Sequence, residues 1–252
     1  MAWFVVVAAL QLPLVAPGRL HVAPNSAPSL QFNCSTQGVD SVALSMVAVQ
    51  GHEVPSQHAS AAQLLGSDQR TYCPRHDCRS FIEIGTNGGS AVLALDQHHA
   101  FRHLFSAEMD ATLFKAGVNL LHDRERVHLY HGDMEDTLPR MIHDAEARDA
   151  DAGILFWLQH HFTRTSLLHE IQIILDAVRH PTRAVIMMAE LHKYTGVPEK
   201  HRHPHTQITF WWTYPKPSEV QRIVCARFPA SHFTMADDTF VAYPNPGAGV
   251  RL

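Results

Sequence analysis

The sequence lacks several features that mark well-known classes of protein. It has no block of basic residues, and 20 Lys and Arg against 24 Asp and Glu give a formal net charge of -4 at pH 7. These numbers disfavour a nucleic-acid-binding surface. No internal repeat is apparent. What remains is a chain of 252 residues, 46% hydrophobic and 17% charged, which suits one α/β domain with additions or two small domains.

Long hydrophobic runs are also scarce. The most apolar run, residues 2–16, is broken by Gln11 and Pro13 and is shorter than the ~20 residues that a bilayer-spanning helix needs. We therefore expect no stable membrane span. The run has the length of a signal-peptide hydrophobic region, which predicts a signal peptide over residues 1–23 and a place in the secretory pathway or outside the cell. The alternative is an N-terminal extension of a cytoplasmic protein.

Cysteine is rare, and the four positions are Cys34, Cys73, Cys78 and Cys225. In an oxidising compartment Cys73 and Cys78 could close a small disulfide loop. His76 lies between them, but two further zinc ligands are not evident, so a disulfide or free thiols are favoured over a metal. Asn33-Cys34-Ser35 is a glycosylation sequon, which has meaning only in a secreted chain.

The most informative stretch is residues 81–95. Its first four residues are apolar and favour a buried strand, and the glycines that follow allow backbone angles closed to other residues. Asn87 is one of the few other residues that tolerate a left-handed conformation. Ser90 is a suitable N-cap for a helix over residues 91–95. A glycine turn between a strand and a helix N-terminus predicts a binding place for a nucleotide-like ligand.

The glycine spacing bears on which ligand this is. The dinucleotide fingerprint G-x-G-x-x-G would need glycine at positions 85, 87 and 90, where the chain has Gly85, Asn87 and Ser90. The spacing that fits is acid-x-Gly-x-x-x-Gly, through Glu83, Gly85 and Gly89. This resembles the first motif of class I S-adenosylmethionine-dependent methyltransferases. The resemblance implies that Glu83 orients the turn or the cofactor's amino end. It further implies that the turn wraps the cofactor's tail, through Gly85, Thr86, Asn87, Gly88, Gly89 and Ser90.

Two further acids follow expected strands. Glu108 lies 23 positions after Gly85, a spacing at which a strand-end carboxylate can bind ribose hydroxyls, and the segment resembles the family's second motif. Asp133 matches the acid that faces the adenine amino group in that family. Their neighbours Met109 and Met134 are assigned to the same cofactor site. The alternative roles are a loop acid or helix cap for Glu108 and a helix cap for Asp133. Asp110 fits a cap better than Glu108 does.

From residue 81 onward, apolar strands alternate with amphipathic segments, which indicates a mainly parallel sheet with helices on both faces. Residues 231–237 and 239–243 predict a terminal hairpin, which resembles the ending of the methyltransferase fold. We therefore expect a Rossmann-like, doubly wound, mainly parallel seven-stranded sheet with a C-terminal antiparallel hairpin. It would occupy residues 80–245, after an extension over residues 24–79 and before a tail over residues 246–252.

The fourth expected strand ends in a phrase that resembles F-W-L-D-x-H-[YF]-[ST] of one methyltransferase subgroup. His161 matches it, but Gln159 replaces the aspartate, and this puts metal dependence and catalysis in question. His161 is the candidate general base, and His160 and Glu190 complete the catalytic candidates. We predict no metal, although these residue types could hold a divalent ion. The histidines at 201, 203 and 205 predict a polar loop on the substrate side.

These features together predict transfer of a methyl group from S-adenosylmethionine to an oxygen or nitrogen atom of a small molecule or glycan. One alternative is a catalytically inactive protein that binds S-adenosylmethionine. A second is an NAD-dependent oxidoreductase, against which the failed dinucleotide fingerprint speaks. The sequence makes no prediction about the oligomeric state.

Overall fold

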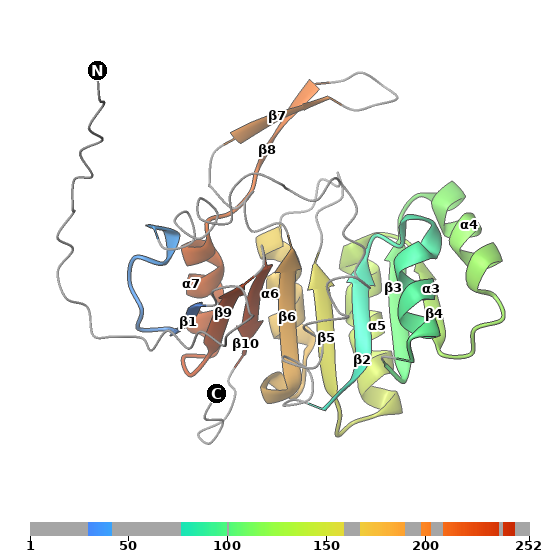
Figure 1. The fold of residues 1–252 in the computed structure, drawn as a ribbon, viewed down its shortest axis with the longest axis horizontal. Helices are drawn as coiled ribbons and strands as arrows, with labels where there is room; N and C mark the ends of the chain where they lie inside the picture. The colour runs from blue at the N-terminus through green and yellow to red at the C-terminus, as the bar shows by residue number, and fades with distance from the viewer. Residues whose placement is uncertain are drawn as a thin grey trace, which may run out of the picture.

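A computed structural model describes residues 30–41, 77–99, 101–158, 167–189, 198–202, 209–236 and 239–244. In these residues an eight-stranded sheet has the order β1-β9-β10-β6-β5-β2-β3-β4 (Figure 1). Its strands are β1 (Leu30–Asn33), β2 (Cys78–Ile84), β3 (His103–Glu108), β4 (Val127–His131), β5 (Gly153–Leu158), β6 (Ala184–Ala189), β9 (His232–Ala236) and β10 (Thr239–Tyr243).

The centre of the sheet is parallel. β2 pairs with β3 on one side and β5 on the other, and the chain runs outward from β2 to β4 and then from β5 to β6. The direction of winding therefore reverses between β2 and β5. In open α/β sheets this reversal places a ligand crevice at the carboxyl ends of the strands. The predicted doubly wound arrangement is confirmed.

Helices cover both faces of the sheet (Figure 1). The helices are α3 (Ser90–Gln97), α4 (Ala111–Leu121), α5 (Met134–Arg148), α6 (Leu167–Ala177) and α7 (Pro217–Arg227), with short 3₁₀ turns η1 (Asn87–Gly89) and η2 (Pro181–Arg183). α5, α6 and α7 bury their apolar sides against one face, around Phe105 and Phe156. α3 packs on the other face, around Phe81 and Leu104. β5 and β6 are buried along their whole lengths, as expected for strands covered on both sides.

The C-terminal hairpin is confirmed. β9 and β10 are antiparallel neighbours, and β10 joins the parallel strands through β6. The structure adds an eighth strand to the predicted seven, because β1 pairs antiparallel with β9 at the sheet edge. The segment after β1 is bound to α7 by a disulfide between Cys34 and Cys225, which are 191 positions apart. Part of the predicted N-terminal extension therefore belongs to the sheet.

A separate two-stranded ribbon stands above the carboxyl edge of the sheet (Figure 1). It pairs β7 (Pro198–Arg202) with β8 (Thr209–Thr213). The predicted loop around the alternating histidines is therefore wrong for His201, which lies in β7. Backbone pairing with β8 holds this segment in a strand, whatever the polarity of its side chains. His203 and His205 lie outside the described residues. In the described part of the chain, no helix combines the length and hydrophobicity needed to cross a bilayer.

Candidate functional site

The turn after β2 has the backbone conformation that its glycines suggested. Gly85, Gly88 and Gly89 have φ values of 92°, 78° and 90°, and Asn87 has φ 43°. The backbone N–H groups of Gly85 and Thr86 both donate to the carbonyl oxygen of Ala107, at 2.9 and 3.1 Å. These bonds fasten the turn to the end of β3. The predicted N-cap role of Ser90 is wrong, because the 3₁₀ turn η1 extends the helical path and leaves Gly89 as the N-cap of α3.

Helix α4 packs directly against this turn. A Cβ atom at Gly89 would lie 2.8 Å from Leu121 Cδ1, and a Cβ at Gly117 of α4 would lie 3.3 Å from the Thr86 methyl group. A Cβ at Gly88 would meet nothing within 4 Å. One side of the turn is therefore packed on α4, while Gly88 borders open space. A loop of this form lets a ligand approach the main chain closely.

Beneath the turn lies a buried chain of hydrogen bonds. Ser106 Oγ donates to Glu83 Oε1 at 2.8 Å, and Thr86 Oγ1 lies 2.6 Å from Ser106 Oγ. Glu83 is only 4% exposed. Its burial raises the pKa of the carboxyl group to about 8, with a smaller upward effect from the charge of Glu108 and an opposing effect from the Ser106 hydrogen bond. At neutral pH, Glu83 is therefore mostly protonated.

Glu108, at the end of β3, contacts the glycine turn directly. Its Oε2 accepts a hydrogen bond from the backbone N–H of Asn87 at 3.0 Å, and its Oε1 accepts one from the N–H of Asp110 at 3.0 Å. A carboxylate offers about four lone-pair sites, so each oxygen can accept a second donor. The structure thus places the acid of the second predicted motif beside the first.

The end of β4 adjoins the same edge. Gly132 N donates to the carbonyl oxygen of Glu108 at 3.1 Å. Asp133, the next residue, caps α5 by accepting from the N–H of Glu135 at 3.1 Å. Its alternative role as a helix cap is confirmed, and its contact with adenine stays a prediction. Asp110 caps α4 as expected, through bonds to two backbone N–H groups.

The two methionines assigned to the site lie in different surroundings. Met109 is 57% exposed at the carboxyl edge and can contact a ligand. Met134, the first residue of α5, is 4% exposed and packs in the hydrophobic core. This packing gives the predicted ligand role of Met134 no support.

The catalytic candidates His160, His161 and Glu190 lie outside the described residues, as does Gln159. Among the described residues, no group of three or more His, Cys, Asp or Glu side chains is arranged to hold a metal ion. The part of the site that the structure describes is therefore the expected cofactor half.

Sequence reasoning missed three residues of this region. Ser106 links Glu83 to Thr86, and its only signal was a hydroxyl inside an apolar strand. Gly117 allows α4 to approach the turn, and an isolated glycine within a helix was its signal. Trp157 is the neighbour of Glu83 across β2 and β5, and its indole N–H is buried without a hydrogen-bond partner in the described structure. Its signal was its place in the phrase F-W-L-D-x-H-[YF]-[ST], whose tryptophan Trp157 matches.

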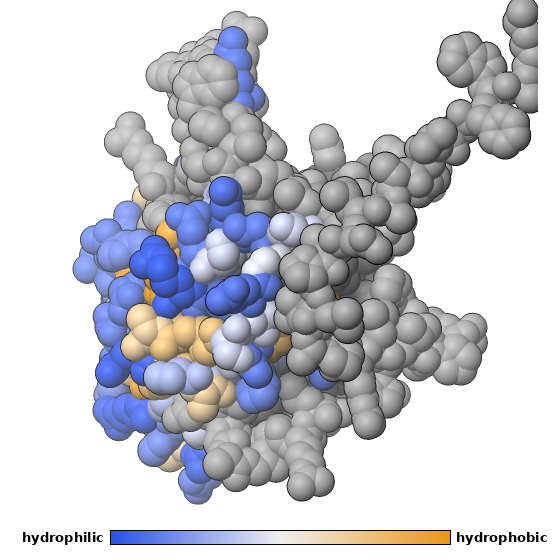
Figure 2. All heavy atoms as spheres, turned by 90° about the vertical axis from the view of Figure 1, so that its left-hand side faces the viewer, coloured by the Kyte–Doolittle hydropathy of each residue, from blue (hydrophilic) through white to orange (hydrophobic). Residues whose placement is uncertain are grey.

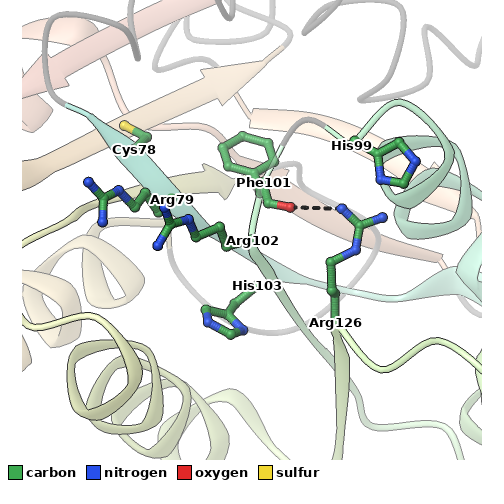
Figure 3. A pocket seen from close by; sticks show the side chains of 7 residues that line it. All are labelled: Cys78, Arg79, His99, Phe101, Arg102, His103 and Arg126. Carbon is green, nitrogen blue, oxygen red and sulfur yellow. Dashed lines mark hydrogen bonds between the residues drawn. The ribbon is translucent and has the colours of Figure 1, made fainter.

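A cavity of about 350 Å³ lies at the opposite, amino edge of the sheet and is lined by three arginines and two histidines (Figure 3). Its cations already have partners. Arg126 donates to the carbonyl oxygen of Phe101 at 3.2 Å and to the Asp96 carboxylate at 2.6 Å. Arg79 pairs with Asp149 at 3.1 Å. The bonds of Arg126 hold the end of α3, and the pair of Arg79 with Asp149 joins β2 to the end of α5, so we read the cluster as structural.

Comparison with known proteins adds similarities of modest extent. No protein-family model and no curated protein matches the chain. Among solved structures, the O-methyltransferase TomG of Streptomyces achromogenes, in complex with SAM, is 17% identical, with 83% of this chain and 91% of that one covered and a TM-score of 0.45. DesVI of Streptomyces venezuelae is 11% identical, over 82% and 99% of the chains, with a TM-score of 0.46. The PH0226 protein of Pyrococcus horikoshii OT3 is 10% identical, over 76% and 93%, with a TM-score of 0.48.

The fold rests on the topology itself. The parallel strands wind outward from β2, and an antiparallel hairpin closes the sheet after β6. The acid-bearing ends of β2 and β3 meet at the glycine turn. The chain therefore has a Rossmann-like, doubly wound fold with a C-terminal antiparallel hairpin, as the sequence predicted.

Proposed function

We propose that this protein binds S-adenosylmethionine at the carboxyl edge of the sheet and transfers its methyl group to an oxygen or nitrogen atom of a small molecule or glycan. The observation that carries the proposal is the hydrogen bond from Asn87 N to the Glu108 carboxylate, 3.0 Å long. It joins the glycine turn and the strand-end acid in one place. An adenosine-containing ligand needs both elements, one for its ribose and one for the chain attached to it.

Glu108 suits a ribose. Each of its oxygens already accepts one backbone N–H, and these bonds fix the orientation of the carboxylate. The remaining lone pairs can accept both hydroxyls of a vicinal diol. A charged acceptor held this way makes hydrogen bonds worth more than neutral ones.

The glycine turn suits the amino-acid end of the same ligand. Gly88 borders open space, so main-chain groups can come close to a ligand. Glu83, buried directly below with Ser106, can give up its proton and face a cationic group. When bound, S-adenosylmethionine supplies an electrophilic methyl group on a sulfonium. The protein's part is to hold the acceptor's lone pair in line with that methyl group.

The acceptor side of the proposal rests on sequence. His161 would accept the proton of the attacking hydroxyl or amine, because an imidazole with an ordinary pKa of about 6.5 does this well at neutral pH. His160 and Glu190 would assist on the same side. A second reading, a protein that binds the cofactor without turnover, is favoured by Gln159, which replaces the aspartate of the similar motif.

Calorimetric titration tests binding. S-adenosylmethionine should bind, and NAD should not. Glu108→Gln should weaken the binding of S-adenosylmethionine by about 1.5–3 kcal/mol, roughly 10- to 150-fold, which is the typical worth of a hydrogen bond to a charged group. Asp110→Asn is the matched control, since asparagine is an equally good N-cap and the affinity should not change. Equal losses in both variants, or tighter binding of NAD, would contradict the proposal.

Turnover separates the enzyme from the binding-only reading. The protein is incubated with methyl-labelled S-adenosylmethionine and extracted small molecules and glycans, and labelled products are identified by mass spectrometry. Transfer that disappears in His161→Ala supports the enzyme. Binding without transfer supports the second reading, and a Gln159→Asp variant that gains metal-dependent transfer would identify a decayed site.

A further inference from the structure

The turn that follows β1 begins at Asn33, whose side-chain oxygen is hydrogen-bonded within the turn. The N–H of Thr36 donates to the carbonyl oxygen of Asn33 at 3.1 Å, which closes a β-turn over the sequon. Asn33 Oδ1 accepts from Ser35 N at 2.9 Å and from Ser35 Oγ at 2.7 Å. The residue is exposed. Among the described residues its side-chain nitrogen makes no hydrogen bond, whereas its amide oxygen accepts the two bonds from Ser35.

The next residue indicates the compartment in which the chain folds. Cys34 forms a disulfide with Cys225 of α7. Disulfides form and persist in oxidising compartments and are rare in the cytosol. The apolar run over residues 2–16 has the length of a signal-peptide hydrophobic region. The disulfide and the apolar run are independent features, and both indicate the secretory pathway.

From these observations we propose that the chain enters the secretory pathway and carries an N-linked glycan on Asn33. The proposal does not depend on methyl transfer. In the reaction, the Asn33 side-chain nitrogen forms a bond to the anomeric carbon of an oligosaccharide carried on a polyprenyl pyrophosphate. The bond between that carbon and the pyrophosphate oxygen breaks, the polyprenyl pyrophosphate leaves, and the nitrogen loses one proton. The host's oligosaccharide transferase supplies the base and the lipid-linked sugar.

The position suits a bulky, hydrated group. Among the described strands β1 is the edge strand and pairs with β9, and four strands separate it from β2, which the glycine turn follows (Figure 1). The described part of the face at that end is mostly hydrophilic, with a narrow apolar band (Figure 2). A glycan there would leave the candidate cofactor site open. It would also stand at the end of the edge strand and hinder pairing of that strand with other chains.

The sequence offers a clean control. The other four asparagines, Asn25, Asn87, Asn119 and Asn245, have no Ser or Thr two positions later. The full chain, with its own N-terminus and a C-terminal tag, is expressed in mammalian cells. Digestion with a peptide N-glycosidase should increase the mobility of the wild type and of Asn25→Gln. It should not change Asn33→Gln or Ser35→Ala, whereas Ser35→Thr should keep the glycan.

Two direct measurements on the wild type guard against variants that fail to fold. Mass spectrometry after the glycosidase should find aspartate at position 33. Alkylation of the denatured, unreduced protein should leave Cys34 and Cys225 unlabelled. A chain that stays in the cytosol with both thiols labelled would overturn the proposal. So would a chain that enters the secretory pathway with its disulfide formed but Asn33 unmodified.

Discussion

The buried carboxyl group of Glu83 makes the proposed cofactor binding sensitive to pH. Burial raises its pKa to about 8 in the ligand-free protein, so about nine-tenths of the molecules hold this proton at pH 7. If Glu83 ionises to face the cationic amino end of S-adenosylmethionine, binding must release that proton. We therefore expect close to one proton released per molecule bound at pH 7.

The size of the effect follows from linkage. Because the ionised form binds, the affinity should rise with pH below the free-state pKa and level off above about 8. Between pH 6 and pH 8, the fraction of ionised Glu83 in the free protein rises roughly 50-fold, and the association constant should rise by about the same factor. Glu83→Gln keeps the oxygen that accepts from Ser106 Oγ but cannot ionise. Its binding should be weaker at pH 8 and nearly independent of pH.

Calorimetry at pH 7 in phosphate and in Tris measures the released proton, because the two buffers take up protons with different enthalpies. The wild type should give different apparent binding enthalpies in the two buffers, and the variant should give the same value in both. Binding by the wild type with no buffer dependence would refute the ionisation of Glu83 while leaving the proposed function intact. No binding at any pH would instead refute the proposed function.

Three further predictions concern stability. Gly89→Ala should lower the free energy of unfolding, measured by urea titration, by about 1–3 kcal/mol, because its Cβ would lie 2.8 Å from a leucine methyl group of α4. Gly88→Ala should lower it by less, because Gly88 also has a positive φ but its Cβ would meet nothing within 4 Å. Burial raises the pKa of Glu170 to about 8, so the native state keeps a proton that the unfolded chain loses above about 4.5, and stability should fall as pH rises from 4.5 to 8. Glu170→Gln should reduce that fall by at most ~5 kcal/mol. If the variant lost as much unfolding free energy between pH 5 and pH 8 as the wild type does, the raised pKa of Glu170 would be contradicted. Cys225→Ser should cost about 2–5 kcal/mol by freeing the loop closed by Cys34, and a reductant should then destabilise the wild type but not the variant.

Local patterns in the sequence determined much of the fold. Asp133, which the sequence offered as a helix cap, caps α5, because a capping side chain acts on backbone groups within a few residues. The strand before the glycine turn and the terminal hairpin were predictable because their patterns are equally local. The positions of Glu83 and Glu108 at strand ends could be read from spacing, because parallel strands bring their carboxyl ends to one edge.

Only the tertiary structure decided the contacts between distant segments. The pairing of β1 with β9, and of Cys34 with Cys225, depends on where the chain's two ends meet, which no local period encodes. The protonated state of Glu83 depends on burial by neighbouring strands. The N-cap of α3 is Gly89 and not the predicted Ser90, because the turn before the helix continues as η1. Short-range patterns determine the helices and strands, whereas strand pairing, burial and the protonation of buried groups depend on how the whole chain packs.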